Sequence, residues 1–218
     1  MTRESVNHSC STLVLDLDGT ISDPSLGIAR CANHALSHCG FESVAPESVH
    51  REIGPPLDEM FIKLAPGVSD RGVAALVAKY RERYSDVGYA ENTLYPDVVS
   101  TIKSLRAAGV RLGVCTSKRR DFAVRILELF EIRQFFAFVD GGEIGVTKAS
   151  QLAGLKRCGD IDQEAIMVGD RWVDLAAAHS NQLRSIGVLW GFGDRAELEK
   201  EAPLQILSRP NELPLVVA

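Results

Sequence analysis

The sequence lacks the features that mark membrane, secreted and nucleic-acid-binding proteins. No apolar run approaches the roughly eighteen residues that a membrane span needs, and the N-terminus has no apolar signal-peptide segment. The five cysteines are odd in number and form no Cys-x-x-Cys pair, which indicates a reducing compartment. The net charge of −5 argues against general nucleic-acid binding. We therefore expect a cytoplasmic protein with neither a membrane nor a nucleic acid as partner.

The composition is that of an ordinary globular protein. Hydrophobic residues make up 45% and charged residues 24% of the 218 residues, which are usual shares for a folded chain. A chain of this length can bury a real core, and it allows one domain with an insertion. The negative net charge does not exclude an anionic substrate, because local cations or a bound metal outweigh the global sign.

Apolar strand-like runs alternate with helical patterns over most of the chain. The expected strands lie near residues 12–17, 110–115, 135–139, 165–168 and 184–189. The expected helices lie at 97–108, 121–130, 149–158 and 174–180. This alternation predicts an α/β fold with a doubly wound, mostly parallel sheet, covered by helices on both faces. Ligands of such folds bind beyond the carboxyl ends of the strands.

The region from about residue 22 to residue 89 interrupts the alternation. It shows helical periodicity at 26–39, 56–64 and 72–84, with Gly and Pro between these segments and no convincing strand. We therefore predict a Rossmann-like core formed by residues 1–21 and 90–218, and a small helical insertion formed by residues 22–89. The connections are expected at 21–24 and 89–96.

The segment from Ser11 to Thr20 ends an apolar, β-branched run in two aspartates, Asp16 and Asp18, followed by Gly19. Side chains two apart share one face of a strand, so both carboxylates reach one site if the strand stays regular. Two close carboxylates repel each other unless a cation lies between them, and Mg²⁺ prefers such oxygen ligands. The alternative is a strand followed by a plain acidic turn.

Four short motifs together resemble a known family. Asp16-Leu-Asp-Gly-Thr20 is similar to the first motif of the haloacid dehalogenase-like superfamily, which consists mostly of phosphatases that use an aspartyl-phosphate. Thr116-Ser117-Lys118, the single Lys148, and Gly169-Asp170 with Asp174 follow in the family's order. The resemblance covers about residues 12–193. The helical insertion, Ile53-Gly-Pro-Pro-Leu57 and the segment 187–193 look like the phosphoglycolate-phosphatase-like group.

The resemblance implies a role for each motif residue. Asp16 is the nucleophile, and Asp18 is the general acid and then the base, which requires its pKa to be raised by its neighbours. Mg²⁺ is bound by Asp16, Asp170 and Asp18, the last through its backbone carbonyl. Thr116 and Lys148 belong to the catalytic set, and Ser117 and Lys118 contact the phosphate. Asp174 supports the metal shell or positions Lys148.

Each of these assignments has a structural alternative. Asp174 is also a candidate helix N-cap, and Thr116 and Ser117 are candidates for the same role. Lys148 is alternatively a solvated surface lysine, as is Lys118 in the basic run Lys118-Arg-Arg120.

Two features of the insertion have a second interpretation. Gly54 and Pro55 form a stiff loop that faces the substrate in similar insertions, although Gly-Pro-Pro also reads as a helix start. His34 and His38 have a spacing that can bind a metal, but a solvated or core-edge helix face is the favoured interpretation, since no distant ligand pair is evident.

The sequence thus predicts a Mg²⁺-dependent phosphatase for a small phosphomonoester that resembles phosphoglycolate or a 5′-nucleotide. Asp18 argues against the dehalogenases of the superfamily, which lack a second aspartate. Ala149, where many relatives have Pro, and the short segment 140–148 suggest a side branch. A phosphomutase and an inactive regulatory domain remain as alternatives, and the oligomeric state, monomer or homodimer, stays open.

Overall fold

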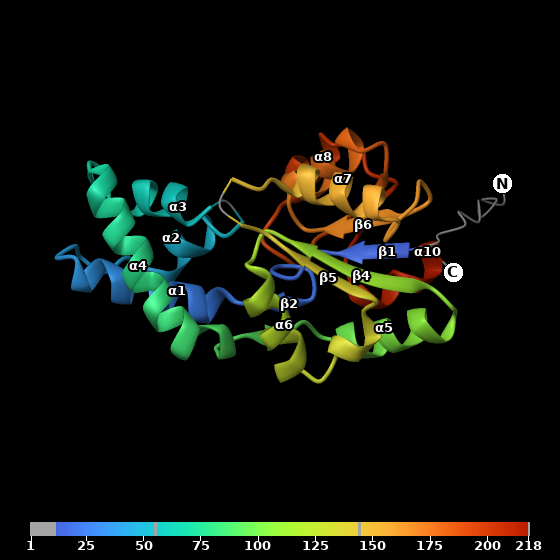
Figure 1. Cartoon of the computed structure of the whole chain (residues 1–218), viewed down its shortest axis with the longest axis horizontal. Helices are drawn as coiled ribbons and strands as arrows, with labels where there is room; N and C mark the ends of the chain where they lie inside the picture. The colour runs from blue at the N-terminus through green and yellow to red at the C-terminus, as the bar shows by residue number, and fades with distance from the viewer. Residues whose placement is uncertain (1–11, 55, 144, 218) are drawn as a thin grey trace. The chain divides into compact units, whose positions relative to one another are not determined.

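The structure is a computed structural model that describes residues 12–54, 56–143 and 145–217, and the chain divides into two compact units. One unit is formed by the chain up to Ile21 together with the chain from Leu94 onwards, and the other is Ser22–Thr93. Figure 1 labels most of the helices and strands of the two units.

The larger unit is built on a six-stranded sheet in the order β5-β4-β1-β6-β7-β8, with every neighbouring pair parallel. The central strand β1 pairs on both sides, since Leu13 lies opposite Leu112 of β4 and Ile166 of β6. This confirms the predicted doubly wound α/β fold. The strands are β1 (Thr12–Leu15), β4 (Arg111–Thr116), β5 (Phe138–Gly141), β6 (Ile166–Gly169), β7 (Arg184–Val188) and β8 (Gln205–Leu207).

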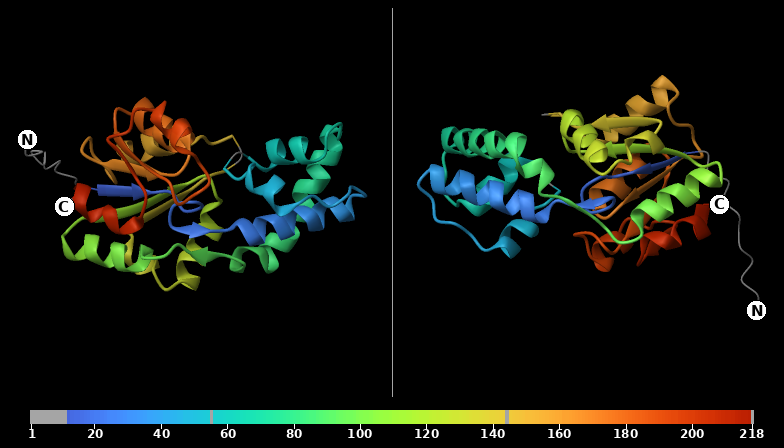
Figure 2. Two further views of the ribbon diagram at one scale, coloured as in Figure 1. Left: turned by 180° about the vertical axis from the view of Figure 1, so that it is seen from behind. Right: turned by 90° about the horizontal axis from the view of Figure 1, so that it is seen from below.

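Helices cover both faces of this sheet, as Figures 1 and 2 show. On one face, α7 and α8 pack over Val14, Cys115 and Met167 of three neighbouring strands. On the other face lie α5 and α6. The helices are α5 (Val98–Ala107), α6 (Arg120–Leu129), α7 (Lys148–Cys158), α8 (Trp172–Ser180), α9 (Arg195–Glu199) and α10 (Pro214–Val217), with single 3₁₀ turns at Arg133–Phe135 and Pro210–Glu212.

The unit Ser22–Thr93 is helical, and its two longest helices, α1 and α4, pack against each other. Tyr80 of α4 stacks on Tyr84 at 5.5 Å between ring centroids and meets Phe61 of α3 edge-on at 6.1 Å. The elements are α1 (Ser25–His38), α2 (Pro46–His50), α3 (Leu57–Leu64), α4 (Asp70–Asp86) and a 3₁₀ turn at Gly88–Ala90.

Two short strands occur where the sequence pattern predicts none. β2 (Ser22–Asp23) and β3 (Thr93–Leu94) pair to form a two-stranded sheet. The expectation that residues 22–89 contain no strand is therefore wrong for Ser22–Asp23, because two residues are too few to show alternation. No helix in the described part of the chain is long and apolar enough to cross a membrane.

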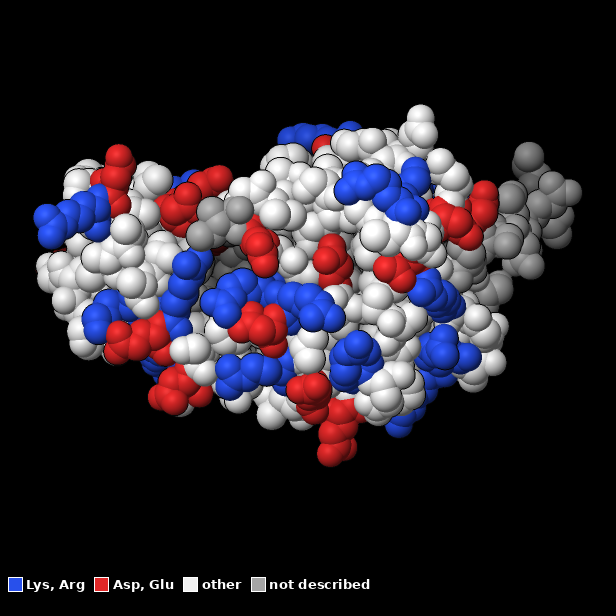
Figure 3. Space-filling model, in the orientation of Figure 1, with Lys and Arg blue, Asp and Glu red and all other residues white. Residues whose placement is uncertain are grey.

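Charged side chains of both signs are mixed over the surface. On the face shown in Figure 3, Lys and Arg alternate with Asp and Glu across both units. This mixture accords with the small net charge of −5. The electrostatics of any site in this protein must therefore be derived from its immediate neighbours.

Candidate active site

The carboxyl ends of the three central strands bring the sequence motifs together. Asp16 follows β1, Thr116 ends β4 and Asp170 follows β6. The Asp16 N–H donates to the Val168 carbonyl at 2.9 Å, which continues the β1–β6 pairing up to the motif residue. Because parallel strands end at one edge of a sheet, residues more than 150 positions apart in the chain line a single site.

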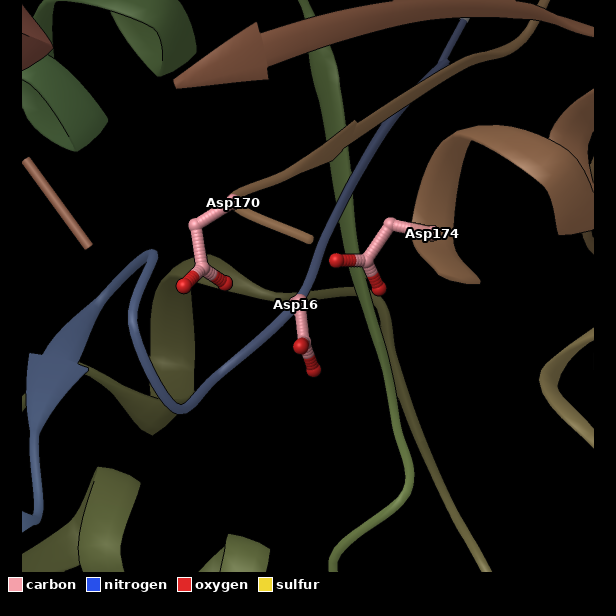
Figure 4. Close-up of side chains that lie close together, drawn as sticks. All are labelled: Asp16, Asp170 and Asp174. Atoms are coloured by element: carbon pink, nitrogen blue, oxygen red, sulfur yellow. The ribbon is translucent and has the colours of Figure 1, made fainter. Parts of the chain in front are cut away.

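Three buried carboxylates form the centre of this site. Asp16, Asp170 and Asp174 each place an oxygen within 4.8 Å of the others, and Figure 4 shows their side chains converging from β1, β6 and α8. Burial raises the pKa of Asp170 well above its ordinary value, and the Asp174 and Asp16 carboxylates raise it further. The cluster is therefore short of positive charge.

A hard divalent cation fits this cluster. Asp170 Oδ2 accepts a hydrogen bond from the Phe192 N–H at 2.7 Å, whereas Asp170 Oδ1 is buried without a hydrogen-bond partner among the described residues. By contrast, the two oxygens of Asp174 accept from Lys148 Nζ and, at 3.1 Å, from the Arg171 N–H. Asp170 Oδ1 is thus an unpartnered oxygen of the kind that Mg²⁺ prefers. Asp16 lies beside it in the same cluster, with its own oxygens already in contact with the Leu17 N–H and Lys148 Nζ.

Lys148 is buried among these carboxylates and is not a solvated surface residue. Its Nζ lies 2.9 Å from Asp16 Oδ2 and also forms an ion pair with Asp174 Oδ1. Burial disfavours the charged ammonium, but Asp16 and Asp174 more than offset this and raise the pKa of Lys148 above its ordinary value. Lys148 is therefore a permanent cation directly beside Asp16.

Asp18 forms an ion pair with a second lysine. Lys118 Nζ lies 2.7 Å from Asp18 Oδ2. Burial raises the pKa of Asp18, with a contribution from Asp16, and Lys118 offsets only part of that rise. The sequence analysis attributed the expected rise to neighbouring groups, but burial is its largest cause. A carboxyl group that keeps its proton more readily suits a general acid.

The Thr116-Ser117-Lys118 loop connects β4 to α6. The Thr116 hydroxyl accepts the Lys118 N–H at 3.3 Å, which leaves its own proton for another acceptor. Ser117 is exposed. The N-cap of α6 is Arg119 without a side-chain cap, so the capping alternative for Thr116 and Ser117 is wrong.

The capping alternative for Asp174 needs a similar correction. The N-cap residue of α8 is Arg171, and Asp174 is the third residue of the helix. Its side chain reaches back to the Arg171 N–H, as in a capping box. The same carboxylate therefore fixes the start of α8 and holds Lys148 in place.

Sequence reasoning missed the supporting segment after β7. Trp190 Nε1 donates to the Thr20 carbonyl at 2.9 Å, and the Phe192 N–H holds Asp170. A Cβ on Gly191 would collide with the Gly19 carbonyl and with Asp170. In the sequence, residues 187–193 indicate only a resemblance to other proteins. Gly191 and Gly193, on either side of Phe192, are the signal that could have indicated a supporting role, since close approach of the backbone requires Gly.

Replacing Gly191 with Ala is expected to damage the site without unfolding the protein. The added methyl group pushes Gly19 and Asp170 apart, so we expect metal affinity and turnover to fall by about 10–100-fold. Metal titration and steady-state kinetics measure both effects. Gly154→Ala is the matched control, because its nearest neighbour would be 3.9 Å away. Equal activity of the two variants would contradict the assigned role of the segment.

The raised pKa of Asp170 predicts how metal and stability are coupled. Because the folded state disfavours the ionised carboxylate, the stability of the metal-free protein falls as the pH rises above the ordinary value of 3.8. Asp170→Asn removes this penalty at pH 7, so we expect the metal-free variant to have a higher unfolding free energy than the metal-free wild type.

Denaturant melts in chelator and in Mg²⁺ measure this coupling. Mg²⁺ should stabilise the wild type and leave Asp170→Asn unchanged, since a ligand stabilises only a fold that binds it. The exposed Asp86, which lies in the other unit, provides the control Asp86→Asn. A metal-free Asp170→Asn variant less stable than the wild type would refute the argument.

The remaining predicted site residues lie in or beside the other unit. Gly54 belongs to the unit Ser22–Thr93, where it has a φ of 120° shortly before α3. Pro55 is outside the described residues. Their assignment to the substrate stays a prediction.

This edge of the sheet combines a carboxylate that can act as nucleophile, an oxygen-rich cation site and two lysines. Together these groups fit a phosphate ester as the class of substrate. Residues 13–188 match the family model described as haloacid dehalogenase-like hydrolase. The chain therefore belongs to the haloacid dehalogenase-like hydrolase family and is a hydrolase acting on phosphate esters.

Individual relatives carry different activities. The chain is 33% identical over 200 residues to the tyrosine-protein kinase PtkA of Mycobacterium tuberculosis, covering 90% of this chain and 68% of that protein. It is 31% identical to a 5′-nucleotidase of Pseudomonas aeruginosa, with 88% of each chain covered. A haloacid dehalogenase-like hydrolase from Streptococcus pneumoniae superimposes with a TM-score of 0.88 at 26% identity, covering 94% and 97% of the two chains. Phosphoglycolate phosphatases match at 27–29% identity.

Proposed function

We propose that this protein is a Mg²⁺-dependent phosphatase that hydrolyses a small phosphomonoester through an aspartyl-phosphate on Asp16. The observation that carries the proposal is the contact between Lys148 Nζ and Asp16 Oδ2 at 2.9 Å, beside the cluster of three buried carboxylates. An ammonium at this place neutralises charge on the nucleophile and on the phosphate as they approach each other. A carboxylate needs no prior deprotonation to attack phosphorus.

The residues divide the reaction into two steps. In the first, an Asp16 oxygen forms a bond to phosphorus, the bond to the ester oxygen breaks, and Asp18 gives its proton to that leaving oxygen. In the second, Asp18 takes a proton from water as the water oxygen attacks phosphorus, and the Asp16–phosphorus bond breaks to release phosphate. Lys118, 2.7 Å from Asp18, keeps the Asp18 carboxylate in place between the steps.

Asp16 and Asp170, with the Asp18 backbone carbonyl, would hold the metal. When bound, Mg²⁺ supplies charge neutralisation for the phosphoryl oxygens. The Thr116 hydroxyl is oriented by the Lys118 N–H and donates its proton to a phosphoryl oxygen. Lys148 contacts the phosphate beside Asp16 and is itself fixed by Asp174.

We assign the unit Ser22–Thr93 as a cap that selects the substrate, with Gly54 and Pro55 in its substrate loop. A site closed by a cap favours small esters over phosphoproteins. The 5′-nucleotidase and phosphoglycolate phosphatase relatives support a soluble metabolite as substrate, and the cytoplasm is the compartment that we infer for it.

Phosphate release from a panel of esters tests the proposal. The panel contains phosphoglycolate, 5′-nucleotides, sugar phosphates, an aryl phosphate and a phosphotyrosine peptide, each with Mg²⁺ and with chelator. We expect release that depends on Mg²⁺ and favours a small ester.

Three other outcomes would overturn parts of the proposal. Retention of a bisphosphate with little net release would indicate a phosphomutase. Equal rates of phosphate release in Mg²⁺ and in chelator would show that the reaction does not require the metal. Preference for the peptide, or phosphate transfer from ATP to tyrosine, would indicate that the substrate is a protein tyrosine, as the name of the PtkA relative suggests. Either result would contradict a small ester as substrate.

A further inference from the structure

The unit Ser22–Thr93 contains an open pocket of about 670 Å³ whose lining includes arginine and histidine side chains besides apolar and serine residues. It lies along α1 and is bordered by α2 with the segment before it and by α4. Every residue that lines it belongs to this unit. Its nitrogen-bearing residues are Arg30, Asn33, His34, His38, His50 and Arg83.

Two of these histidines form a close pair. His34 and His38 are one turn apart on the last part of α1, so their side chains lie on the same face. Their ring centroids are 4.5 Å apart, and the ring planes are tilted by 43°. The rings are therefore not stacked flat.

This separation matches the distance that a shared metal ion imposes. A metal lies about 2.0–2.1 Å from an imidazole nitrogen, hence roughly 3.2 Å from the ring centroid. Two imidazoles on one ion then have centroids about 4.5 Å apart at a right angle and about 5.2 Å apart at a tetrahedral angle. The observed 4.5 Å falls at the lower of these values.

The surroundings hold the pair in place. The Asn33 side chain donates to the Val44 carbonyl at 2.9 Å and accepts the Val44 N–H at 2.8 Å, which fixes the segment facing α1. Positive charge close to the pair is partly balanced. Arg83 and Arg30 are both paired with Glu91, at 2.7 Å each.

One acidic group on α4 acts on both imidazoles. The Glu82 carboxylate, which pairs with Lys79, interacts electrostatically with His34 and His38. Among the described residues, only the aspartates Asp16, Asp170 and Asp174 bring three candidate ligands within 4.8 Å. The pocket therefore offers two protein ligands, and water completes the coordination.

We propose that His34 and His38 form a second metal site, which binds a nitrogen-preferring divalent ion of the Ni²⁺ and Cu²⁺ class, whose ligands stand at right angles. Imidazole suits these ions, whereas Mg²⁺ prefers oxygen. The site is chemically distinct from the carboxylate cluster and independent of the phosphatase reaction. It bridges two turns of α1 at the end of the helix.

Titration of Ni²⁺ into the full chain in millimolar Mg²⁺ tests the site. Isothermal calorimetry should detect one Ni²⁺ that His34→Gln and His38→Gln each weaken by more than about tenfold. His50→Gln is the matched control within the pocket and His179→Gln the control in the other unit; both should bind as the wild type does. The Cu²⁺ electron paramagnetic resonance spectrum should show coupling to two nitrogens in the wild type and to fewer in the His38→Gln variant.

Three results would overturn the assignment. Identical Ni²⁺ isotherms for the wild type and His38→Gln would show that His34 and His38 do not bind the metal as a pair. An equal loss in His50→Gln would refute the two-ligand site. A Cu²⁺ spectrum without nitrogen coupling would exclude imidazole ligation, whatever the calorimetry gives.

Discussion

Asp16→Asn is expected to leave a folded protein that turns over no ester. The amide has nearly the shape of the carboxylate, but it is a far weaker nucleophile, so kcat should fall on the order of 10⁴-fold or more. The variant keeps an oxygen for the Leu17 N–H, which donates to Asp16 Oδ1 at 2.8 Å. It removes one carboxylate beside Lys148 and leaves the Asp174 partner.

Stopped assays with the best ester of the panel measure this loss. Quenched samples of the wild type should contain phosphate bound to the protein in an acid-stable, base-labile form, and samples of the variant should contain none. Asp23→Asn is a control, since Asp23 lies outside the site unit. Residual turnover within tenfold of the wild type would disprove the nucleophile assignment.

Lys148→Met should reduce both activity and stability. The methionine fills a similar volume but leaves Asp16 and Asp174 without their shared cation. Removing one partner of a buried ion pair costs about 3–5 kcal/mol, which corresponds to a fall of about 6–20 °C in melting temperature for a chain of this size. The loss of charge neutralisation should lower kcat by about 10²–10³-fold.

A second substitution separates the two effects. Lys148→Met combined with Asp174→Asn removes one of the two orphaned carboxylates, so stability should recover in part while kcat stays low. The exposed Lys103 provides the control Lys103→Met, for which both quantities should be unchanged. If the double variant recovered activity together with stability, Lys148 would be a structural residue and not part of the reaction.

The sequence predicts the larger elements because their apolar periodicity is strong. The five long strands and the helices that follow them are found within a few residues of their predicted positions. β8, α2, α9 and α10 are missing from the prediction, since three to five residues give no readable period. The motif residues Asp16 and Asp170 are predictable because each follows a run that ends at the sheet edge.

The support of the site is not predictable in the same way. Trp190 reaches the Thr20 carbonyl across 170 positions, and no local pattern encodes such a contact. The Lys118–Asp18 ion pair likewise depends on the path of the loop after β4. Burial of Asp18 is a property of the complete fold, so the main cause of its raised pKa cannot be predicted from the sequence.

The central position of β1 has a consequence for how the protein is made. Thr12–Leu15 leaves the ribosome early, but its partners β4 and β6 begin only at Arg111 and Ile166. The unit Ser22–Thr93 is continuous in sequence, and all of it is synthesised before either partner strand. Until β4 is available, β1 is an unpaired apolar segment, which is a state open to chaperones and to aggregation. The site is complete only once β6, which precedes Asp170, has paired with β1.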